Sequence, residues 1–327
     1  MKMENKNERE GQEIKVEEAA RMLLLGEDVL ILSHQHPDGD TLGSAFGLCF
    51  ALQKCGKRAR IECSDPIADR YDYLTDHYTE ESFVPQMIVA VDIADTQLFG
   101  EKLWPYRDQV DLCIDHHPSN THYARRVLLE ADSAATAEVI YEVIKAMGVE
   151  FDPVMASAVY TGIATDTGCF RYTNVTARTH RIAADLYEKG AMAGMINRVM
   201  FETKSLSRIR MEQLVLSTME YHFDNRCALI VVTLDAIEQT GITDSELDGI
   251  SAIPRQIEGV QAGITLREKE GGYKISLRTS DNISATAVCS ALGGGGHARA
   301  AGCFIAGNLE EAKGAILEAL RPELEGK

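Results

Sequence analysis

The sequence predicts an α/β protein with two domains: an N-terminal domain with a doubly wound, mainly parallel sheet, and a smaller C-terminal α+β domain. Its 327 residues, 45% of them hydrophobic, suit two cores better than one. Short, almost continuously apolar segments alternate with helical patterns in the first half, as in a parallel sheet covered on both faces. From residue 225 the pattern changes to longer strands, a glycine run and a final helix.

Four apolar segments of the first half are predicted strands, and the helical patterns around them are predicted to cover the sheet. The strands are expected within 29–34, 58–65, 87–96 and 110–120. Helices are expected at 41–56, 133–148, 153–164 and 176–190. Gly56 ends the first of these helices, because glycine is the usual residue just past a helix C-terminus.

The chain divides into three parts. Residues 1–190 form the expected larger domain, with a polar, loose tail over residues 1–12. Residues 191–224 are predicted to be an amphipathic helical connector, which would serve a homodimer or pack between the domains. Residues 225–327 form the expected smaller domain. Its elements are strands at 227–235, 260–269 and 273–280, a helix at 283–292 and a last helix from Asn308.

Composition narrows the setting and the partners. The N-terminus lacks the apolar core of a signal peptide, and no run approaches the ~20 apolar residues of a membrane span, so we expect a cytoplasmic protein without membrane contact. Eight scattered cysteines without a CxxC pair indicate reduced thiols. The net charge of −17 argues against binding long duplex nucleic acid, although local cations or metal ions can hold a short anionic substrate.

Acidic and histidine residues follow three of the four N-terminal strands. They are His34, Asp38, Asp40, Asp92, Asp115, His116 and His117, with Asp166 where a later helical pattern breaks. Ligands of open α/β sheets bind beyond the carboxyl ends of the strands, so these distant residues can converge there. Singly, each has an ordinary explanation as a turn, a helix cap or a solvated side chain.

Together, these residues predict a dinuclear metal site. Desolvating so many polar groups is costly unless each has a partner, and a divalent cation supplies one. Carboxylates mixed with imidazoles suit Mn²⁺ above all, with Mg²⁺ or Co²⁺ as alternatives. Two such ions would clamp a phosphate and activate a water for in-line attack.

A second cluster lies around LGGGGHARAAG, residues 292–302. Successive glycines let backbone N–H groups approach an anion, and cations nearby would favour a phosphate. The candidate ligand-binding residues are Arg278, Asn282, Gly294, Gly295, Gly296, His297 and Arg299. The alternative is a flexible loop between a helix and a strand.

These motifs together resemble the DHH phosphoesterase family. HQHPDGD matches the pattern His-x-x-Pro-Asp-x-Asp, VDIAD and TDTG supply further motif aspartates, and DHH at 115–117 is the namesake. GGGGHARAAG matches the glycine-rich signature of the DHH-associated C-terminal domain. The motifs stand in the family's order and cover both halves of the chain. Within the family, the chain looks most like the stand-alone bacterial and archaeal nanoRNases, which also act on 3′-phosphoadenosine 5′-phosphate (pAp).

The resemblance implies roles for these residues. The N-terminal domain would hold two Mn²⁺ ions, and the C-terminal domain would hold the terminal phosphate or base of a short nucleotide across a cleft. The implied metal ligands are His34 and Asp38 for one ion, Asp40, His116 and Asp166 for the other, and Asp92 between them. His117 would contact the scissile phosphate or act at the leaving group, and Asp115 would orient its neighbours. His36 is not a ligand in this pattern and would be a bystander or face the substrate.

The expected activity is hydrolysis of short oligoribonucleotides, including the linear dinucleotide pApA, to mononucleotides, with pAp phosphatase as a second activity. One alternative is a cyclic-dinucleotide phosphodiesterase, although such relatives usually carry membrane and sensor regions. Another is a non-catalytic nucleotide-binding regulator on the same scaffold. A phosphatase of small non-nucleotide phosphates is a third, and it would not need the C-terminal cluster. Family II inorganic pyrophosphatases share the N-terminal motifs, but their Ser-Arg-Lys-Lys run is absent here.

Overall fold

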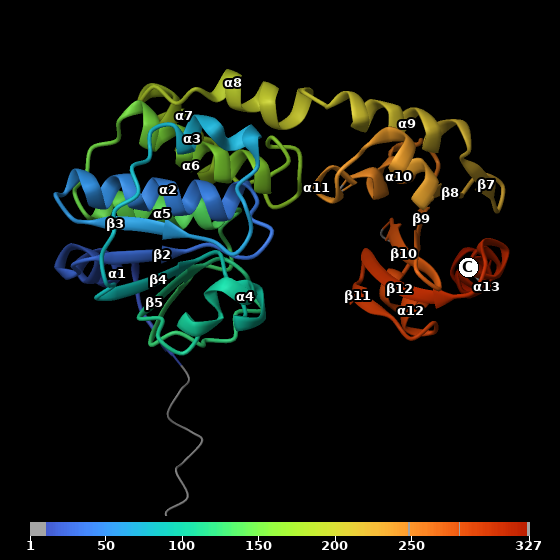
Figure 1. Cartoon of the computed structure of the whole chain (residues 1–327), viewed down its shortest axis with the longest axis horizontal. Helices are drawn as coiled ribbons and strands as arrows, with labels where there is room; N and C mark the ends of the chain where they lie inside the picture. Colours follow the sequence, from blue (N-terminus) through green and yellow to red (C-terminus); the bar gives the residue numbers. More distant parts are fainter. Residues whose placement is uncertain (1–10, 248, 281, 326–327) are drawn as a thin grey trace, which may run out of the picture. The chain divides into compact units, whose positions relative to one another are not determined.

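A computed structural model describes residues 11–247, 249–280 and 282–325 of the chain (Figure 1). They divide into two compact units, Met1–Thr203 and Lys204–Lys327, called here the N-terminal and C-terminal units. The stretch expected as a connector is shared between them. Helix α8 (Ala193–Asn197) and a π-helical turn (Arg198–Glu202) belong to the first unit, and helix α9 (Leu206–Ser217) belongs to the second.

The N-terminal unit is built on a six-stranded sheet in which every pairing is parallel. In spatial order its strands are β1 (Gln12–Glu13), β6 (Arg126–Leu129), β5 (Leu112–Asp115), β4 (Met87–Val91), β2 (Val29–Leu32) and β3 (Ala59–Glu62). The parallel sheet predicted from the apolar segments is therefore present, and β1 and β6 are additions to it. Part of the expected tail, residues 1–10, lies outside the described residues, while Gln12 pairs in β1.

The two faces of this sheet are covered unequally. One face carries the long helices and the larger core, and the other carries short helical turns and a smaller core (Figure 1). The long helices are α1 (Val16–Leu25), α2 (Gly39–Lys54), α5 (Thr136–Ala146), α6 (Pro153–Asp166) and α7 (Ala177–Glu188). The opposite face is covered by α4 (Gly100–Leu103) with the 3₁₀ turns Thr96–Phe99 and Trp104–Tyr106. On the first face, the turn Asp69–Tyr71 and helix α3 (Asp72–Thr75) add Tyr71 and Leu74 to the larger core.

Helices α2 and α6 approach so closely that glycine is required between them. A Cβ on Gly43 would lie 2.4 Å from the Ala158 carbonyl oxygen and 2.6 Å from the Gly162 nitrogen. A Cβ on Gly39 would lie 2.4 Å from the Thr165 side chain. The helices are thus antiparallel, and their packing places the start of α2 beside the end of α6.

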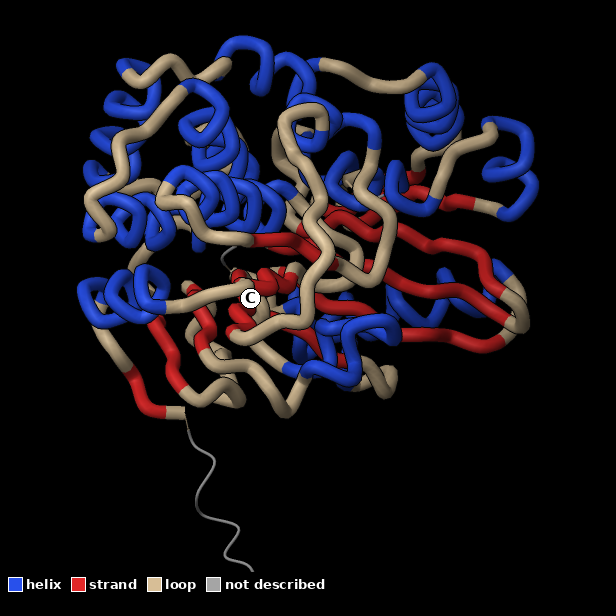
Figure 2. The backbone as a smooth tube through the Cα atoms, turned by 60° about the vertical axis from the view of Figure 1, so that its left-hand side comes forward, coloured by secondary structure: helices blue, strands red, loops and turns tan. Residues whose placement is uncertain are grey.

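The C-terminal unit has a mixed six-stranded sheet with helices packed against it (Figure 2). In spatial order the strands are β11 (Gly295–His297), β12 (Ala300–Ala306), β10 (Gly272–Thr279), β9 (Ala262–Lys269), β8 (Cys227–Val232) and β7 (Glu220–His222). Within this sheet, as far as the described residues show, only strands β8 and β9 pair in parallel, and the other pairings are antiparallel. The glycine run therefore includes a short paired strand, and the flexible-loop alternative is wrong for Gly295 and Gly296.

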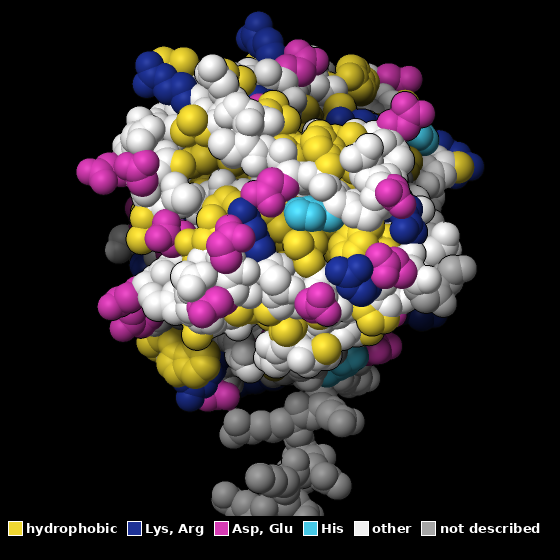
Figure 3. Space-filling model, turned by 90° about the vertical axis from the view of Figure 1, so that its right-hand side faces the viewer, with side chains coloured by type: hydrophobic (Ala, Val, Ile, Leu, Met, Phe, Trp, Pro, Cys, Tyr) yellow, Lys and Arg dark blue, Asp and Glu magenta, His cyan; other side chains and the backbone are white. Residues whose placement is uncertain are grey.

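Two hydrophobic clusters flank the strands of this unit. The helical elements are α10 (Leu234–Thr240), α11 (Asp244–Leu247), the 3₁₀ turn Ile250–Gln256, α12 (Ala285–Ser290) and α13 (Leu309–Glu325). In the face drawn in Figure 3, Lys and Arg side chains are interspersed with Asp and Glu rather than gathered into one basic stripe. No helix in the described ranges has both the length and the apolar character needed to cross a membrane.

Replacing Gly162 with Ala should destabilise the N-terminal unit. The added Cβ would lie 2.5 Å from the Ala137 Cβ and 2.7 Å from Asp40 Oδ1, so backbone and side chains must shift. We expect the free energy of unfolding in urea to fall by about 1–3 kcal/mol. The matched control is Gly194→Ala in α8, where a Cβ meets no atom within 4 Å. The control should be neutral or slightly stabilising, and equal losses in the two variants would contradict the packing argument.

Candidate metal centre

His34 follows strand β2, and a hydrogen bond to the backbone of the next residue orients its ring. Its Nδ1 lies 2.7 Å from the Gln35 carbonyl oxygen, which can only accept a hydrogen bond, so Nδ1 carries a proton. Its Nε2 lies 3.7 Å from Asp38 Oδ1 and 3.7 Å from Asp92 Oδ2. Burial opposes charging of the ring, but the two carboxylates together raise the pKa of His34. The space at Nε2 thus favours positive charge.

Asp38 begins helix α2 as its N-cap. Its Oδ1 accepts hydrogen bonds from the backbone N–H groups of Asp40 (2.9 Å) and Thr41 (3.1 Å). The alternative to metal binding that the sequence offered for Asp38 was a turn, whereas the structure shows one oxygen of this carboxylate capping the helix. Capping does not exclude metal binding, because the cap fixes the carboxylate beside His34.

Asp40 is buried because it caps a helix that is distant in sequence. The residue before α5 is Ala135, which has no side chain that can accept a hydrogen bond. Asp40 accepts instead, from the Thr136 N–H at Oδ2 (2.7 Å) and the Ala137 N–H at Oδ1 (2.9 Å). The Thr136 hydroxyl also donates to Asp92 Oδ1 (2.7 Å). Thr136 was not predicted from the sequence. The available signal was Ala135, which stands where a helix usually has a capping side chain and so indicates that the cap comes from elsewhere.

Asp92 follows strand β4 in a left-handed backbone conformation, with φ of 60°. This conformation is uncommon for a residue other than glycine, and it is typical of functional sites where the surrounding structure enforces it. The backbone N–H of Asp92 donates to the Ile114 carbonyl oxygen (3.0 Å), which anchors the turn to the end of β5. The carboxylate is 4% exposed and lies between the rings of His34 and His116.

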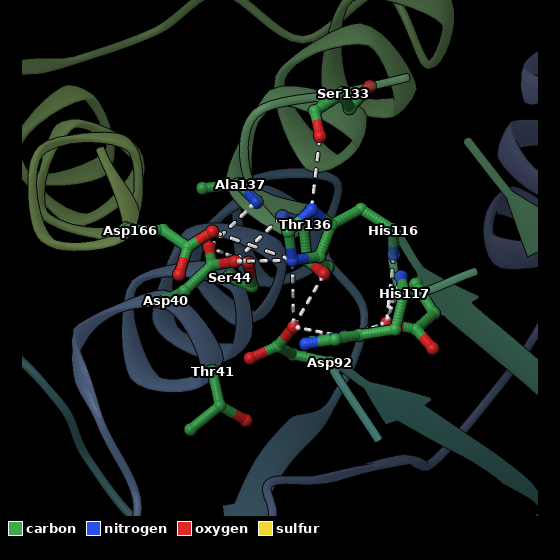
Figure 4. Close-up of polar contacts among 12 residues, drawn as sticks. Asp40, Thr41, Ser44, Asp92, His116, His117, Ser133, Thr136, Ala137 and Asp166 are labelled. Atoms are coloured by element: carbon green, nitrogen blue, oxygen red, sulfur yellow. Dashed lines mark hydrogen bonds and ion pairs between the residues drawn. The ribbon is translucent and has the colours of Figure 1, made fainter. Parts of the chain in front are cut away.

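His116 gives the clearest indication that a cation fits this centre. Its Nδ1 lies 3.0 Å from the Ser133 carbonyl oxygen, which can only accept a hydrogen bond, so Nδ1 carries a proton and Nε2 is the nitrogen left to meet another partner. That Nε2 is buried without a hydrogen-bond partner and faces the carboxylates of Asp166, Asp40 and Asp92 at 3.5, 3.9 and 3.9 Å (Figure 4). Three carboxylates around a buried nitrogen without a hydrogen-bond partner favour positive charge among them, and imidazole with carboxylates is a ligand set that divalent metal ions take, so these residues fit a metal ion.

The structure brings all six expected ligands together in overlapping groups. Each group offers ligand atoms that lie within 4.8 Å of one another. The groups are His34–Asp38–Asp92, Asp40–His116–Asp166 and Asp92–His116–His117. Asp92 is shared between the first and third groups, and His116 between the second and third. His36, whose role was left open, belongs to none of them, because its exposed ring pairs with Asp65 instead (Nδ1–Oδ2, 3.2 Å).

Burial and crowding raise the pKa values of two carboxylates in this centre. Burial and the neighbouring charge of Asp38 raise the pKa of Asp92 to about 6. Burial and the charges of Asp92 and Asp166 raise the pKa of Asp40 well above its ordinary range. The centre therefore favours a bound cation, which would remove the mutual repulsion of the carboxylates.

His117 and Asp115 form a separate polar pair beside the metal ligands. Asp115 is fully buried and accepts hydrogen bonds from the ring of His117 (Nδ1–Oδ1, 2.8 Å) and from the Asn120 side chain (2.6 Å). The hydrogen bond to Asp115 raises the pKa of His117 to about 9, against the effect of burial. Although burial works in the opposite direction, these hydrogen bonds lower the pKa of Asp115. His117 is thus a protonated, half-exposed ring with a fixed orientation, and Asn120 is a positioning residue that sequence analysis missed.

In the C-terminal unit, strand register aligns two of the candidate cations. Arg278 in β10 is paired with Ala300 in β12, and Ala300 is paired with His297 in β11. Residues directly opposite one another share a face of the sheet, and neighbouring strands are ~4.8 Å apart. Arg278 and His297 therefore flank the small side chain of Ala300 on one face of the sheet.

The other C-terminal candidates have different environments. Gly294 and Gly296 are required by packing, because a Cβ would lie 2.2 Å from the Gly302 carbonyl oxygen or 2.6 Å from that of Ala300. A Cβ on Gly295 meets nothing within 4 Å, so only its backbone approach to a ligand would require glycine. Arg299 donates to the carbonyl oxygens of Ser280 (3.0 Å) and Ile283 (2.8 Å) and thereby ties the turn before α12 to the sheet. Asn282 is exposed in that turn.

Comparison with known proteins gives consistent matches across both units. Residues 28–163 match the N-terminal domain of the DHH family, and residues 227–326 match the DHHA1 domain. The chain is 34% identical over 302 residues to the bifunctional oligoribonuclease and PAP phosphatase NrnA of Thermus thermophilus, covering 90% of each chain. It is 23% identical to the protein of the same name from Bacillus subtilis, covering 88% of this chain and 92% of that one.

A solved structure has the same fold along the whole chain. An exopolyphosphatase-related protein from Bacteroides fragilis superimposes with a TM-score of 0.82 at 26% identity, covering 94% of this chain and 96% of that one. The predicted α/β architecture and the predicted family are both confirmed by these matches. The chain therefore belongs to the DHH family and is one of its phosphoesterases.

Proposed function

We propose that the chain hydrolyses short oligoribonucleotides, including pApA, to mononucleotides, and that it removes a phosphate from pAp. The observation that carries the proposal is the pair of ligand groups His34–Asp38–Asp92 and Asp40–His116–Asp166, with Asp92 Oδ1 of the first group 3.9 Å from the buried Nε2 of His116 in the second. The curated NrnA relatives are named for both activities, and they are similar along most of this chain.

The metal proposed is Mn²⁺, two ions of it, held in the groups His34–Asp38–Asp92 and Asp40–His116–Asp166. Mixed imidazole and carboxylate ligands suit this ion. When bound, the two ions supply positive charge for a phosphate and lower the pKa of water, as in other two-metal sites. The ligands themselves hold fixed positions through helix caps and backbone hydrogen bonds, so little reorganisation is needed on loading.

The chain's own residues supply the remaining steps. His117, protonated near neutral pH and oriented by Asp115, is proposed to contact the scissile phosphate and give a proton to the leaving 3′-oxygen. Arg278, His297 and the backbone of Gly295 are proposed to hold the far end of the nucleotide. The dispersed cations on the face in Figure 3 and the charge of −17 support a short substrate rather than a long one.

The first experiment is a product profile with Mn²⁺. We expect 5′-labelled RNA of two to five nucleotides and pApA to be converted to mononucleotides, pAp to be dephosphorylated, and cyclic-di-AMP and pyrophosphate to remain. Asp92→Asn, which suits the left-handed backbone, and Asp92→Ala should each lower kcat/KM at least ~100-fold. Asp95→Asn in the same loop is the control, since its Oδ1 only caps Gln97.

The other outcomes of that experiment separate the alternatives. Consumption of cyclic-di-AMP alone would make the chain a cyclic-dinucleotide phosphodiesterase. Turnover of small non-nucleotide phosphates without preference for nucleotides would contradict the proposal that the C-terminal unit binds part of the nucleotide. Nucleotide binding without any turnover would favour a regulator, and full activity of Asp92→Asn would contradict the dinuclear proposal.

In the metal-free protein, the free energy of unfolding should depend on pH because of the crowded carboxylates. The pKa of Asp92 is about 6 in the fold and ordinarily 3.8, so the folded chain binds more protons between these values. The Asp92 contribution to the free energy of unfolding must then fall as pH rises from about 4 to about 6. In urea denaturation with chelator, Asp92→Asn should gain stability over wild type across this window. With Mn²⁺ at pH 7 the order should reverse, and a wild-type advantage without metal would contradict the argument.

Two glycine variants separate packing from substrate contact in the C-terminal unit. Gly295→Ala places its Cβ in open space, so stability should be unchanged while KM for short nucleotides rises about 5- to 10-fold. Gly294→Ala, with a Cβ 2.5 Å from that of Cys303, should instead lower the unfolding free energy. An unchanged KM for Gly295→Ala would show that this backbone does not touch the substrate.

A further inference from the structure

A pocket opens beside the metal ligands, within the N-terminal unit. Its volume is about 210 Å³, enough for roughly seven waters at ~30 Å³ each. The lining residues are Asp38, Gly39, Arg70, Tyr71, Thr165, Asp166 and Met200. Two of them are expected metal ligands, one from each ligand group, so the pocket begins where a scissile phosphate would lie.

Arg70 is the cation of this pocket, and sequence analysis did not single it out. Its guanidinium lies over the Tyr71 ring, 5.3 Å from the ring centre. Among the described residues, no carboxylate forms an ion pair with it. Other arginines of this unit do form such pairs, as Arg58 does with Asp28 and Arg125 with Asp111. In a chain of net charge −17, an exposed guanidinium held by an aromatic ring and without a carboxylate partner is available to an anion.

Another lining residue of the pocket, Met200, comes from an unusual segment. Met200 lies in the π-helical turn Arg198–Glu202, and such turns are rare and frequent at functional sites. A methionine thioether adapts its shape to an apolar or aromatic group. The pocket therefore combines a metal-binding end, a cation and an apolar wall, which are the elements that a phosphate joined to a nucleoside requires.

We propose that this pocket binds the terminal phosphate monoester of a short nucleotide, with Arg70 as the residue that recognises it. The inference rests on the proposed function and adds a second phosphate position to it. The scissile phosphate lies at the ligand groups, the next phosphate lies at Arg70, and the nucleoside between them passes Met200. Guanidinium groups bind phosphate with two parallel hydrogen bonds, which a lysine cannot reproduce.

The test compares pApA with ApA, which differ only in the 5′-phosphate. Arg70→Ala should lower kcat/KM for pApA about 10- to 100-fold and change that for ApA by less than about threefold. Arg70→Lys should recover only part of the loss for pApA. The matched control is Arg107→Ala, because Arg107 also stacks on an aromatic ring, that of Trp104 at 4.3 Å, but does not line the pocket. The control should leave the ratio of the two substrates unchanged.

Either of two results would overturn the inference. Equal losses for pApA and ApA would mean that Arg70 acts at the scissile phosphate or on its ligands. No loss for pApA would mean that Arg70 does not contact substrate. If wild type hydrolysed neither dinucleotide, the proposed function would be wrong, and the pocket is tested by binding instead. Dinucleotides with a methylene in place of the bridging oxygen should then bind more tightly with a 5′-phosphate, and Arg70→Ala should abolish that preference.

Discussion

The mutual repulsion of three carboxylates held close together is the main constraint on this structure. Asp40, Asp92 and Asp166 point their carboxylates at one imidazole nitrogen, and two of the three are buried. Left to themselves, such groups would separate or take up protons. The fold holds them together, and the raised pKa values of these residues express that conflict. A cation among the three carboxylates would remove their repulsion. Metal binding would therefore also stabilise this edge of the sheet.

Three devices resist the repulsion, and each uses the backbone. The first turn of α5 donates hydrogen bonds from two backbone N–H groups to Asp40. The carboxylate therefore stabilises the start of the helix, and the helix fixes the position of the carboxylate. The close contact of α2 with α6 at Gly43 and Gly162 brings the start of one helix to the end of the other. The left-handed turn at Asp92 aims its carboxylate between two rings. Preorganisation of this kind costs local strain, which the large core under these helices can support.

The sequence was sufficient to predict that the candidate ligands converge, but not which residues position them. Polar residues that end apolar strands are a local signal, and parallel strands end at one edge, so convergence of His34, Asp92 and His116 could be predicted. Thr136, Gly162 and Asn120 could not, because their roles lie in contacts with partners whose proximity only the packed fold reveals. The same holds for β6, a four-residue strand with no alternation to mark it. In the C-terminal unit, the sequence predicted an anion-binding role for the glycine run and left a flexible loop open as the alternative, whereas close packing against β12 explains two of its glycines.

Charge explains why recognition would be divided among a few local sites. A chain with a net charge of −17 repels a polyanion unless each phosphate meets its own positive partner. Metal ions at the candidate ligand groups, Arg70, and Arg278 in the C-terminal unit would be such partners, and the cations on the face in Figure 3 lie among acidic groups. A short nucleotide has few phosphates and needs few such partners. Each further phosphate would lie over acidic surface, so a preference for short substrates would follow from the charge distribution as well as from shape.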